Sequence, residues 1–427
     1  MWWPCCRYAT FPQGYCGCIL GAVLSGRSLA WHVRARRDRE EITDREKGLA
    51  DCIREGKASR RVGDESRGAA AAQQERRKSM ADPILVEITR GNLVESAHRG
   101  ALAVVDSEGR EVMALGDVER AIFPRSAVKA LQALPLIETG AADRYGLNVA
   151  ELALACSSHS GEPRHAETAA SMLTKAGRDL SCLECGTHWP SNEQAARGLA
   201  AEGRVPSALH NNCSGKHSGF ICVACATDVD PKGYVGQDHA VQRRIKTILE
   251  EMMGIKLSDA SRAVDGCSIP TYATPLSALA RAFARFGSGA TLSQDRAAAA
   301  RRLREAVAAE PFMVAGTGRF DAVVMQALGA KAFTKTGAEG VYCAALPEQG
   351  LGIAVKCDDG GGRAAEAVMA SLILAFVSFP TSSARSWLPS PTSRSSIGTA
   401  SRREGCGRGG TLWRRPKVQA AEFVALW

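Results

Sequence analysis

Apolar residues are distributed differently in the middle of the chain and at its two ends. Between about residues 83 and 376 they recur at regular spacings, whereas both flanks lack such periodicity. Short alternating or apolar runs near each end of this central part predict β-strands at residues 84–89, 101–105, 111–115, 332–335, 340–345 and 352–356. Residues 107–110 include a glycine and predict the turn between the second and third strands.

Helical periodicity fills the interval between the two groups of strands. Apolar residues every three or four positions predict helices at residues 127–136, 149–157, 164–176, 192–203, 214–226, 238–253, 275–286, 293–308, 319–328 and 363–376. This order predicts an α+β domain in which both chain ends supply strands to one antiparallel sheet around a helical region. We expect the functional site at the junction of sheet and helices.

The chain therefore divides into residues 1–79, 80–376 and 377–427. The first segment combines Trp and Cys clusters with an Arg- and Glu-rich run and can bury little apolar surface. Met80 resembles a natural start, so a wrongly assigned upstream start codon is our preferred explanation, and a disordered extension is the alternative. The last segment is rich in Ser, Pro, Arg and Gly, which indicates a low-complexity tail or a frameshift.

Charge is concentrated in the flanks. The net charge is +9, but residues 1–80 carry 16 Lys and Arg against 10 Asp and Glu, and residues 377–427 carry 8 against 2. The part between them has 30 basic and 33 acidic residues, so the sequence does not support a basic nucleic-acid-binding face.

The cysteines and the apolar runs bear on location. The 15 cysteines are an odd number without the spacing of a disulfide framework, which favours reduced thiols in a cytoplasm. An apolar run at residues 18–24 is too short to span a membrane, and no clean cleavage pattern for a signal peptide follows it. We predict a cytoplasmic protein.

A candidate catalytic unit lies at residues 123–132, where Pro124 suits the first turn of a helix. Ser126 and Lys129 are three residues apart, so a helix would place them on one face. A desolvated lysine can act as the base that activates a serine nucleophile. The spacing alone is weak evidence, because Ser-x-x-Lys occurs by chance roughly once or twice in a chain this long.

Two further motifs follow in the order typical of serine β-lactamases and penicillin-binding proteins. Residues 156–161 read Cys-Ser-Ser-His-Ser-Gly and contain Ser158, and residues 335–337 read Lys-Thr-Gly. Each alone has an ordinary explanation, as helix capping or as a hairpin turn. Together with Ser126 and Lys129 they are moderately specific.

Cysteines suggest possible metal sites. Cys213 and Lys216 would lie one turn apart at a helix start, and Cys267 could supply a third ligand. Lysine is an uncommon zinc ligand, so the chemistry alone favours a helix start with an unrelated free cysteine. Two Cys-x-x-Cys pairs, 182/185 and 222/225, lack the flanking turns of a zinc ribbon, and we interpret them as buried or bystander thiols.

Five motifs together resemble the rhizobial-type L-asparaginases, a zinc-containing asparaginase II family. They read Phe-Pro-Arg-Ser-Ala-Val-Lys, Cys-Ser-Ser-His-Ser-Gly-Glu, His-Asn-Asn-Cys-Ser-Gly-Lys-His, Asp-Gly-Cys-Ser-Ile-Pro and Lys-Thr-Gly-Ala-Glu-Gly. The similarity covers about residues 82–376. It implies a β-lactamase-like fold, hydrolysis of L-asparagine to L-aspartate and ammonia, and a homodimer.

The resemblance also implies roles for individual residues. By correspondence with the family's motifs, the catalytic set is Ser126 as nucleophile with Lys129 beside it, and Ser158 paired with Lys335. The zinc ligands are Cys213, Lys216 and Cys267, which reverses the interpretation from chemistry alone. Substrate binding is expected of Asp265, Arg125 and His217.

Three alternatives stay open at this point. One is a serine glutaminase of the same fold, and another is a penicillin-recognising enzyme, against which the missing export signal argues. The third is a catalytically inactive zinc-binding homologue. It is favoured if the tail, which replaces the family's terminal segment, prevents correct folding.

Overall fold

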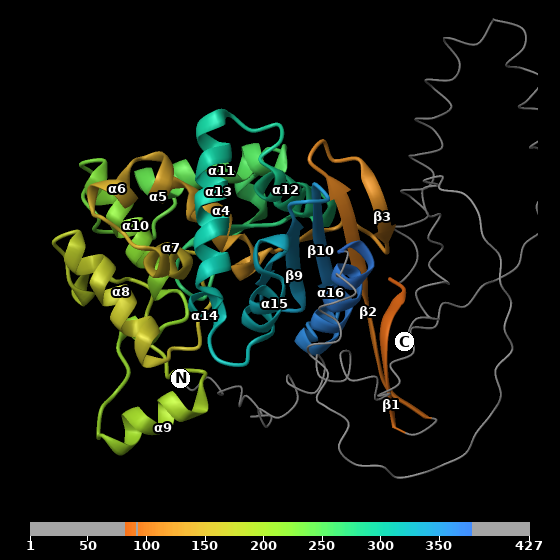
Figure 1. Ribbon diagram of the computed structural model, residues 1–427, viewed down its shortest axis with the longest axis horizontal. Coiled ribbons are helices and arrows are strands. Elements are labelled where there is room, and N and C mark those ends of the chain that lie inside the picture. Colours follow the sequence, from red (N-terminus) through yellow and green to blue (C-terminus); the bar gives the residue numbers. More distant parts are fainter. Residues whose placement is uncertain (1–81, 91–92, 378–427) are drawn as a thin grey trace, which may run out of the picture.

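The computed structural model describes residues 82–90 and 93–377 (Figure 1). The strands are β1 (Ile84–Arg90), β2 (Leu93–Asp106), β3 (Glu111–Leu115), β4 (Ala121–Ile122), β5 (Arg262–Val264), β6 (Pro270–Tyr272), β7 (Thr274–Pro275), β8 (Phe333–Thr336), β9 (Val341–Leu346) and β10 (Leu351–Cys357). The α-helices are α4 (Lys129–Gln132), α5 (Leu134–Glu138), α6 (Ala141–Arg144), α7 (Val149–Ala155), α8 (Pro163–Lys175), α9 (Glu193–Ala201), α10 (Ser214–Ala226), α11 (Ala240–Met253), α12 (Leu276–Ser288), α13 (Gln294–Ala309), α14 (Pro311–Ala315), α15 (Phe320–Leu328) and α16 (Gly362–Phe376). Short 3-10 segments include η3 (Arg125–Val128) and η5 (Ala208–His210).

Strands from both ends of the described chain form one antiparallel sheet, as the sequence predicts. Its order is β1-β2-β10-β9-β8, with β3 paired to β2. In Figure 1 the orange β2 therefore lies beside the blue β10. The helices from α4 to α15 lie between these two groups of strands in sequence, which confirms the predicted α+β arrangement.

Both faces of the sheet are covered, which explains why its strands are so apolar. Ala101, Ala103 and Val105 of β2 belong to the core shared with α12, whereas Leu102 and Val104 belong to the core shared with α16. Gly352 on β10 permits the close packing of α12: a Cβ there would lie 2.0 Å from the carbonyl oxygen of Ala280. Any larger residue would push the helix from the sheet.

The predicted helix at residues 127–136 is wrong in its continuity. The chain forms η3, then α4, and then α5 after a break at Ala133. Pro135 lies in the first turn of α5, where the backbone N–H groups have no partner within the helix, so the proline costs no hydrogen bond. In the middle of one long helix it would have removed a hydrogen bond between successive turns.

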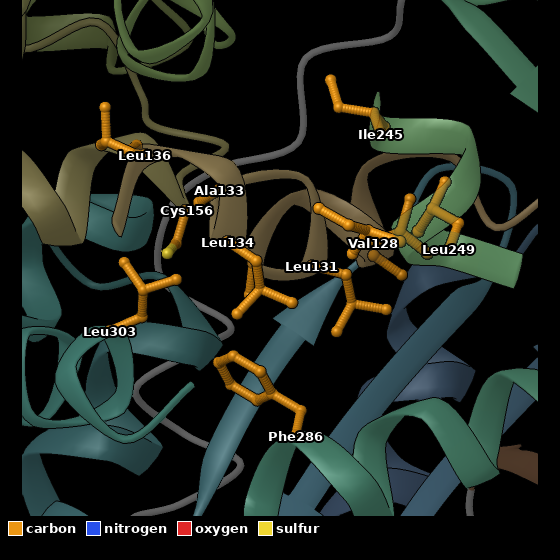
Figure 2. Packing of buried hydrophobic residues seen from close by; sticks show 14 of the residues in the cluster. Val128, Leu131, Ala133, Leu134, Leu136, Cys156, Ile245, Leu249, Phe286 and Leu303 are labelled. Atoms are coloured by element: carbon orange, nitrogen blue, oxygen red, sulfur yellow. The ribbon is translucent and has the colours of Figure 1, made fainter. Parts of the chain in front are cut away.

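Apolar packing fixes the segment that carries Lys129. Leu131 and Leu134 are completely buried and pack in one core with side chains of α11, α12 and α13 (Figure 2). The labelled partners in Figure 2 include Ile245, Leu249, Phe286 and Leu303. The packing holds Lys129, the first residue of α4, at the boundary between the helical region and the sheet.

Other differences are local. Strand β2 begins at Leu93, eight residues before the predicted start, because its polar first half pairs with β1. The short α6, α14 and the pairings β4–β7 and β5–β6 were not expected. Within the described residues no helix is long and apolar enough to cross a membrane. The predictions for residues 1–79 and 378–427 lie outside the described residues.

Candidate active site

Ser158 lies between two buried lysines from different parts of the chain. Lys129 Nζ and Lys335 Nζ each donate a hydrogen bond to Ser158 Oγ, at 2.9 Å in both cases. Ser158 follows α7, Lys129 begins α4, and Lys335 is on the edge strand β8. The Ser158 amide donates to the carbonyl of Val314, which fixes the loop beneath the hydroxyl.

Burial makes the two amines unusually poor at holding a proton. It lowers the pKa of Lys335 from its ordinary 10.5 to about 7, with Asp321 acting in the opposite direction. Burial also lowers the pKa of Lys129, against the opposing charge of Cys213. Lys335 can therefore accept and return a proton near neutral pH, which is the property required of a general base, and burial weakens the cationic form of Lys129 in the same direction.

Ser126 is placed differently from Ser158. It is partly exposed in η3, and within the described chain no group forms a hydrogen bond with its Oγ. Lys129 directs its amine to Ser158 and to the carbonyl of Asn212, at 3.2 Å, so the spacing in sequence does not become a Ser126–Lys129 hydrogen bond. A partly exposed hydroxyl without a partner is accessible to a substrate.

The residue before Ser126 has an unusual backbone. Arg125 adopts a positive φ of 51°, which costs a non-glycine residue on the order of 1 kcal/mol. Its Nε donates to Asp265 Oδ1 at 2.7 Å, and this ion pair holds the arginine in place. Burial opposes ionisation of Asp265, but the charges of Arg125 and Lys216 outweigh it and lower the pKa of this carboxyl.

A thiol and amine cluster lies next to the lysines. Lys216 Nζ, on α10, donates to Cys267 Sγ at 3.1 Å. A hydrogen bond with Cys267, aided by the charges of Lys129 and Lys216, lowers the pKa of the Cys213 thiol well below its ordinary value. The same hydrogen bond, with burial, raises the pKa of Cys267. The structure thus brings together the three residues predicted as zinc ligands.

The donor atoms of this cluster fit zinc. Zn²⁺ prefers thiolate sulfur and nitrogen, and catalytic zinc sites keep three protein ligands and one open position. Among residues 82–90 and 93–377 no set of three or more His, Cys, Asp and Glu side chains could hold a metal ion, so the candidate set depends on the lysine. Of the two Cys-x-x-Cys pairs, Cys185 and Cys222 are buried and donate to backbone carbonyls. Cys185 is near enough to this cluster to feel the charges of Cys213 and Lys216.

His217 has one occupied and one free ring nitrogen. The amide of Glu184 donates to the Tyr234 hydroxyl, so that hydroxyl can donate to His217 Nδ1, 2.6 Å away. The neutral ring then carries its proton on Nε2. Nε2 is buried and has no partner among the described residues, so this donor is unsatisfied in the structure.

Sequence reasoning missed several residues that support the site. Asp321 accepts a hydrogen bond from the Thr336 amide at 3.1 Å and another from the Tyr342 hydroxyl. Glu162 accepts from Ser160, and from both the amide and the hydroxyl of Thr317, and so joins two loops. A charged residue in an otherwise apolar helix, such as Asp321 in α15, was the available signal.

The arrangement is that of a β-lactamase-like or penicillin-binding-protein-like α+β fold. Its sheet combines terminal strands, one lysine begins a helix, and the other lies on an edge strand in a Lys-Thr-Gly motif. A model of the L-asparaginase II family matches residues 86–399, and the chain belongs to that family.

Among solved structures, the chain is similar to a β-lactamase from Mycobacterium bovis, with 14% identity, 65% of this chain and 94% of that chain covered, and a TM-score of 0.34. It is similar to a simvastatin synthase mutant from Aspergillus terreus, with 13% identity, 63% and 90% coverage, and a TM-score of 0.33. It is also similar to Mglu in its glutamate form, with 16% identity, 65% and 60% coverage, and a TM-score of 0.37. These TM-scores lie below 0.5, so the activities of these proteins are not carried over. No curated protein matches the sequence significantly.

Proposed function

We propose that this protein hydrolyses L-asparagine to L-aspartate and ammonia through an acyl-enzyme formed on Ser126. The family match supports amide hydrolysis. The observation that carries the mechanism is the placement of Ser158 Oγ 2.9 Å from both Lys129 and Lys335. This arrangement supplies a proton relay, and the η3 segment that carries Ser126 packs against the strand that carries Lys335.

In the proposed reaction, Ser126 Oγ attacks the side-chain amide carbon of asparagine as its proton passes to the relay. The relay then gives a proton to the amide nitrogen, the C–N bond breaks, and ammonia leaves. Water, deprotonated by the same relay, attacks the ester and releases aspartate and the free serine. Lys335 suits this role because burial lowers its pKa to about 7, so it can accept and return a proton near neutrality.

Substrate binding is assigned to Arg125, Asp265 and His217. The Arg125 guanidinium has five N–H donors, of which the described pair with Asp265 uses one, so others can bind the α-carboxylate. Asp265 is kept ionised and can bind the α-ammonium group. The Nε2 donor of His217 would bind a substrate oxygen.

The proposal includes one zinc ion held by Cys213, Lys216 and Cys267. When bound, zinc supplies a fixed divalent charge that can polarise a nearby oxygen. The ion would also tie α10, through Cys213 and Lys216, to the turn that carries Cys267 and Asp265. A homodimer and a cytoplasmic location stay predictions, and light scattering of the purified chain tests the first.

The decisive experiment measures ammonia release from L-asparagine and L-glutamine by the purified chain and by Ser126→Ala. We expect hydrolysis of asparagine, a loss of at least about a thousandfold in the variant, and unchanged circular dichroism. Mass spectrometry of quenched reactions should place a β-aspartyl group on the peptide that contains Ser126. Substantial activity in Ser126→Ala would refute the assignment of the nucleophile.

The same assay separates the alternatives. Preference for glutamine would indicate a glutaminase, and turnover of a chromogenic cephalosporin would indicate a penicillin-recognising enzyme. A folded chain that contains zinc but hydrolyses none of the three would be an inactive homologue.

A further inference from the structure

The end of strand β8 is held by a buried carboxylate that the proposed reaction does not use. Asp321, on α15, is 2% exposed. Its Oδ2 accepts a hydrogen bond from the Thr336 amide at 3.1 Å, and its Oδ1 accepts one from the hydroxyl of Tyr342 on β9. Thr336 and Tyr342 face each other in the β8–β9 ladder, so one carboxylate fixes both strands at this point.

This point adjoins the amine of Lys335. Lys335 Nζ donates to the carbonyl of Thr336 at 2.9 Å as well as to Ser158 Oγ. The Thr336 carbonyl therefore accepts from Lys335, and the Thr336 amide donates to Asp321. Within residues 82–90 and 93–377, β8 is the edge strand of the sheet and no further strand satisfies the outward amide of Thr336, so Asp321 takes that place.

Charged groups on several elements face Lys335. Lys129 on α4 and Arg319 before α15 disfavour its cationic form, whereas Asp321 and the Cys213 thiolate favour it. Asp321 thus favours the cationic form of Lys335 while its own oxygens are held by Thr336 and Tyr342.

We propose that Asp321 is a positioning residue for the Lys335–Ser158 relay: it fixes the end of β8 so that the lysine amine reaches Ser158. The inference rests on the proposed function, in which Lys335 moves protons. Asp321 is not proposed to contact substrate. Its second effect is electrostatic, because its charge opposes the loss of the proton from Lys335, against the larger effect of burial.

The test compares three variants with the wild type. Asp321→Asn removes the charge but keeps one acceptor. Tyr342→Phe removes one hydrogen bond and keeps the charge. Asp321→Glu keeps the charge and displaces it. Each is assayed for kcat and KM with L-asparagine between pH 5 and 9, with circular dichroism as the check on folding.

For Asp321→Asn we expect kcat to fall about 10- to 100-fold with KM within about threefold, and the acidic limb of the pH profile to move to lower pH. Tyr342→Phe should leave the limb in place. Asp321→Glu should lower kcat without moving the acidic limb of the pH profile. If Asp321→Asn does not fold, Asp321→Glu tests the positioning role of Asp321 instead. Unchanged kcat and an unchanged limb in the folded variants would overturn the inference.

A second readout does not depend on activity. In protein with ¹³C-labelled lysine, the Cε signal of Lys335, assigned with Lys335→Arg, reports its titration by NMR. A lower midpoint in Asp321→Asn than in the wild type supports the inference, and an identical midpoint contradicts it. If Lys335→Ala kept full activity, the proposed function would fail, whereas the NMR result would still decide the electrostatic effect of Asp321.

Discussion

Lys335 and Lys216 are both buried lysines of one site, yet their surroundings act on them in opposite directions. Lys335 has a serine hydroxyl and a carbonyl as partners, and burial lowers its pKa to about 7. Burial also tends to lower the pKa of Lys216, but the charges of Cys267 and Cys213 outweigh it and raise that pKa. The charge of Asp321 offsets the desolvation of Lys335 only in part, whereas the two thiols outweigh the desolvation of Lys216.

This difference separates two kinds of chemistry that are close in space. The amine of Lys335, whose pKa is lowered, can give up and regain a proton, which suits a relay. The amine of Lys216 keeps its proton beside the thiols and must lose it to join them as a zinc ligand. Lys129 lies between the two, because it donates to Ser158 and also feels the charge of Cys213.

The largest expected effect comes from removing the relay lysine. Lys335→Met should lower kcat about a thousandfold, because a positioned general base typically contributes 10²- to 10⁴-fold. Its zinc content, measured by elemental analysis, should equal that of the wild type. Lys216→Met is the matched comparison and should lose zinc. If Lys335→Met lost zinc as well, the two lysines would not have separate roles.

The thiol cluster should account for the metal. We expect about one zinc per chain, and less than about a tenth of that in Cys213→Ala/Cys267→Ala, because each thiolate is a primary ligand. Affinity should decrease as pH falls, since thiols and lysine must lose protons to bind. Cys182→Ala/Cys185→Ala is the control and should keep its zinc. Undiminished zinc in the first variant would rule out this site.

Close packing between β8 and the Ser126 segment should matter for activity. A Cβ on Gly337 would lie 2.8 Å from the carbonyl oxygen of Pro124 and 2.8 Å from Val341 Cβ, and neither atom can move easily. Gly337→Ala should therefore displace the relay from Ser126 and lower kcat about 10- to 100-fold. Gly198→Ala, where nothing lies within 4 Å of the new Cβ, should leave kcat unchanged. Equal kcat values for the two variants would refute the close-contact argument.

The smallest effect is on stability. The pKa of Lys335 is lowered to about 7 in the folded protein, so between pH 7 and its ordinary pKa of 10.5 the unfolded chain binds a proton that the folded chain does not. Stability therefore rises with pH across this window, and the cost of burying the lysine, at most about 5 kcal/mol, is complete below pH 7. Lys335→Met should raise Tm by a few degrees more at pH 7 than at pH 10. Calorimetry at both values checks this, and an equal shift would mean that Lys335 is buried without penalty.

The sequence alone determined much of the local structure. Strand β3 and helix α10 have the predicted bounds, and most other elements differ from prediction by one or two residues. These elements depend on periodicity, capping and turn residues, which act over a few neighbouring positions. The motifs likewise contained Lys129, Lys335 and the residues of the thiol and amine cluster, but not Asp321.

Only the tertiary structure decided how those residues are paired. Lys129 is three residues from Ser126 but donates to Ser158, and Lys335 reaches the same hydroxyl from 177 positions away. The break before α5, the pairing of the polar half of β2 with β1, and the hold of Asp321 on β8 are likewise consequences of packing. Side-chain direction and desolvation depend on which surfaces meet when the sheet closes around the helical region. Spacing along the chain does not contain that information.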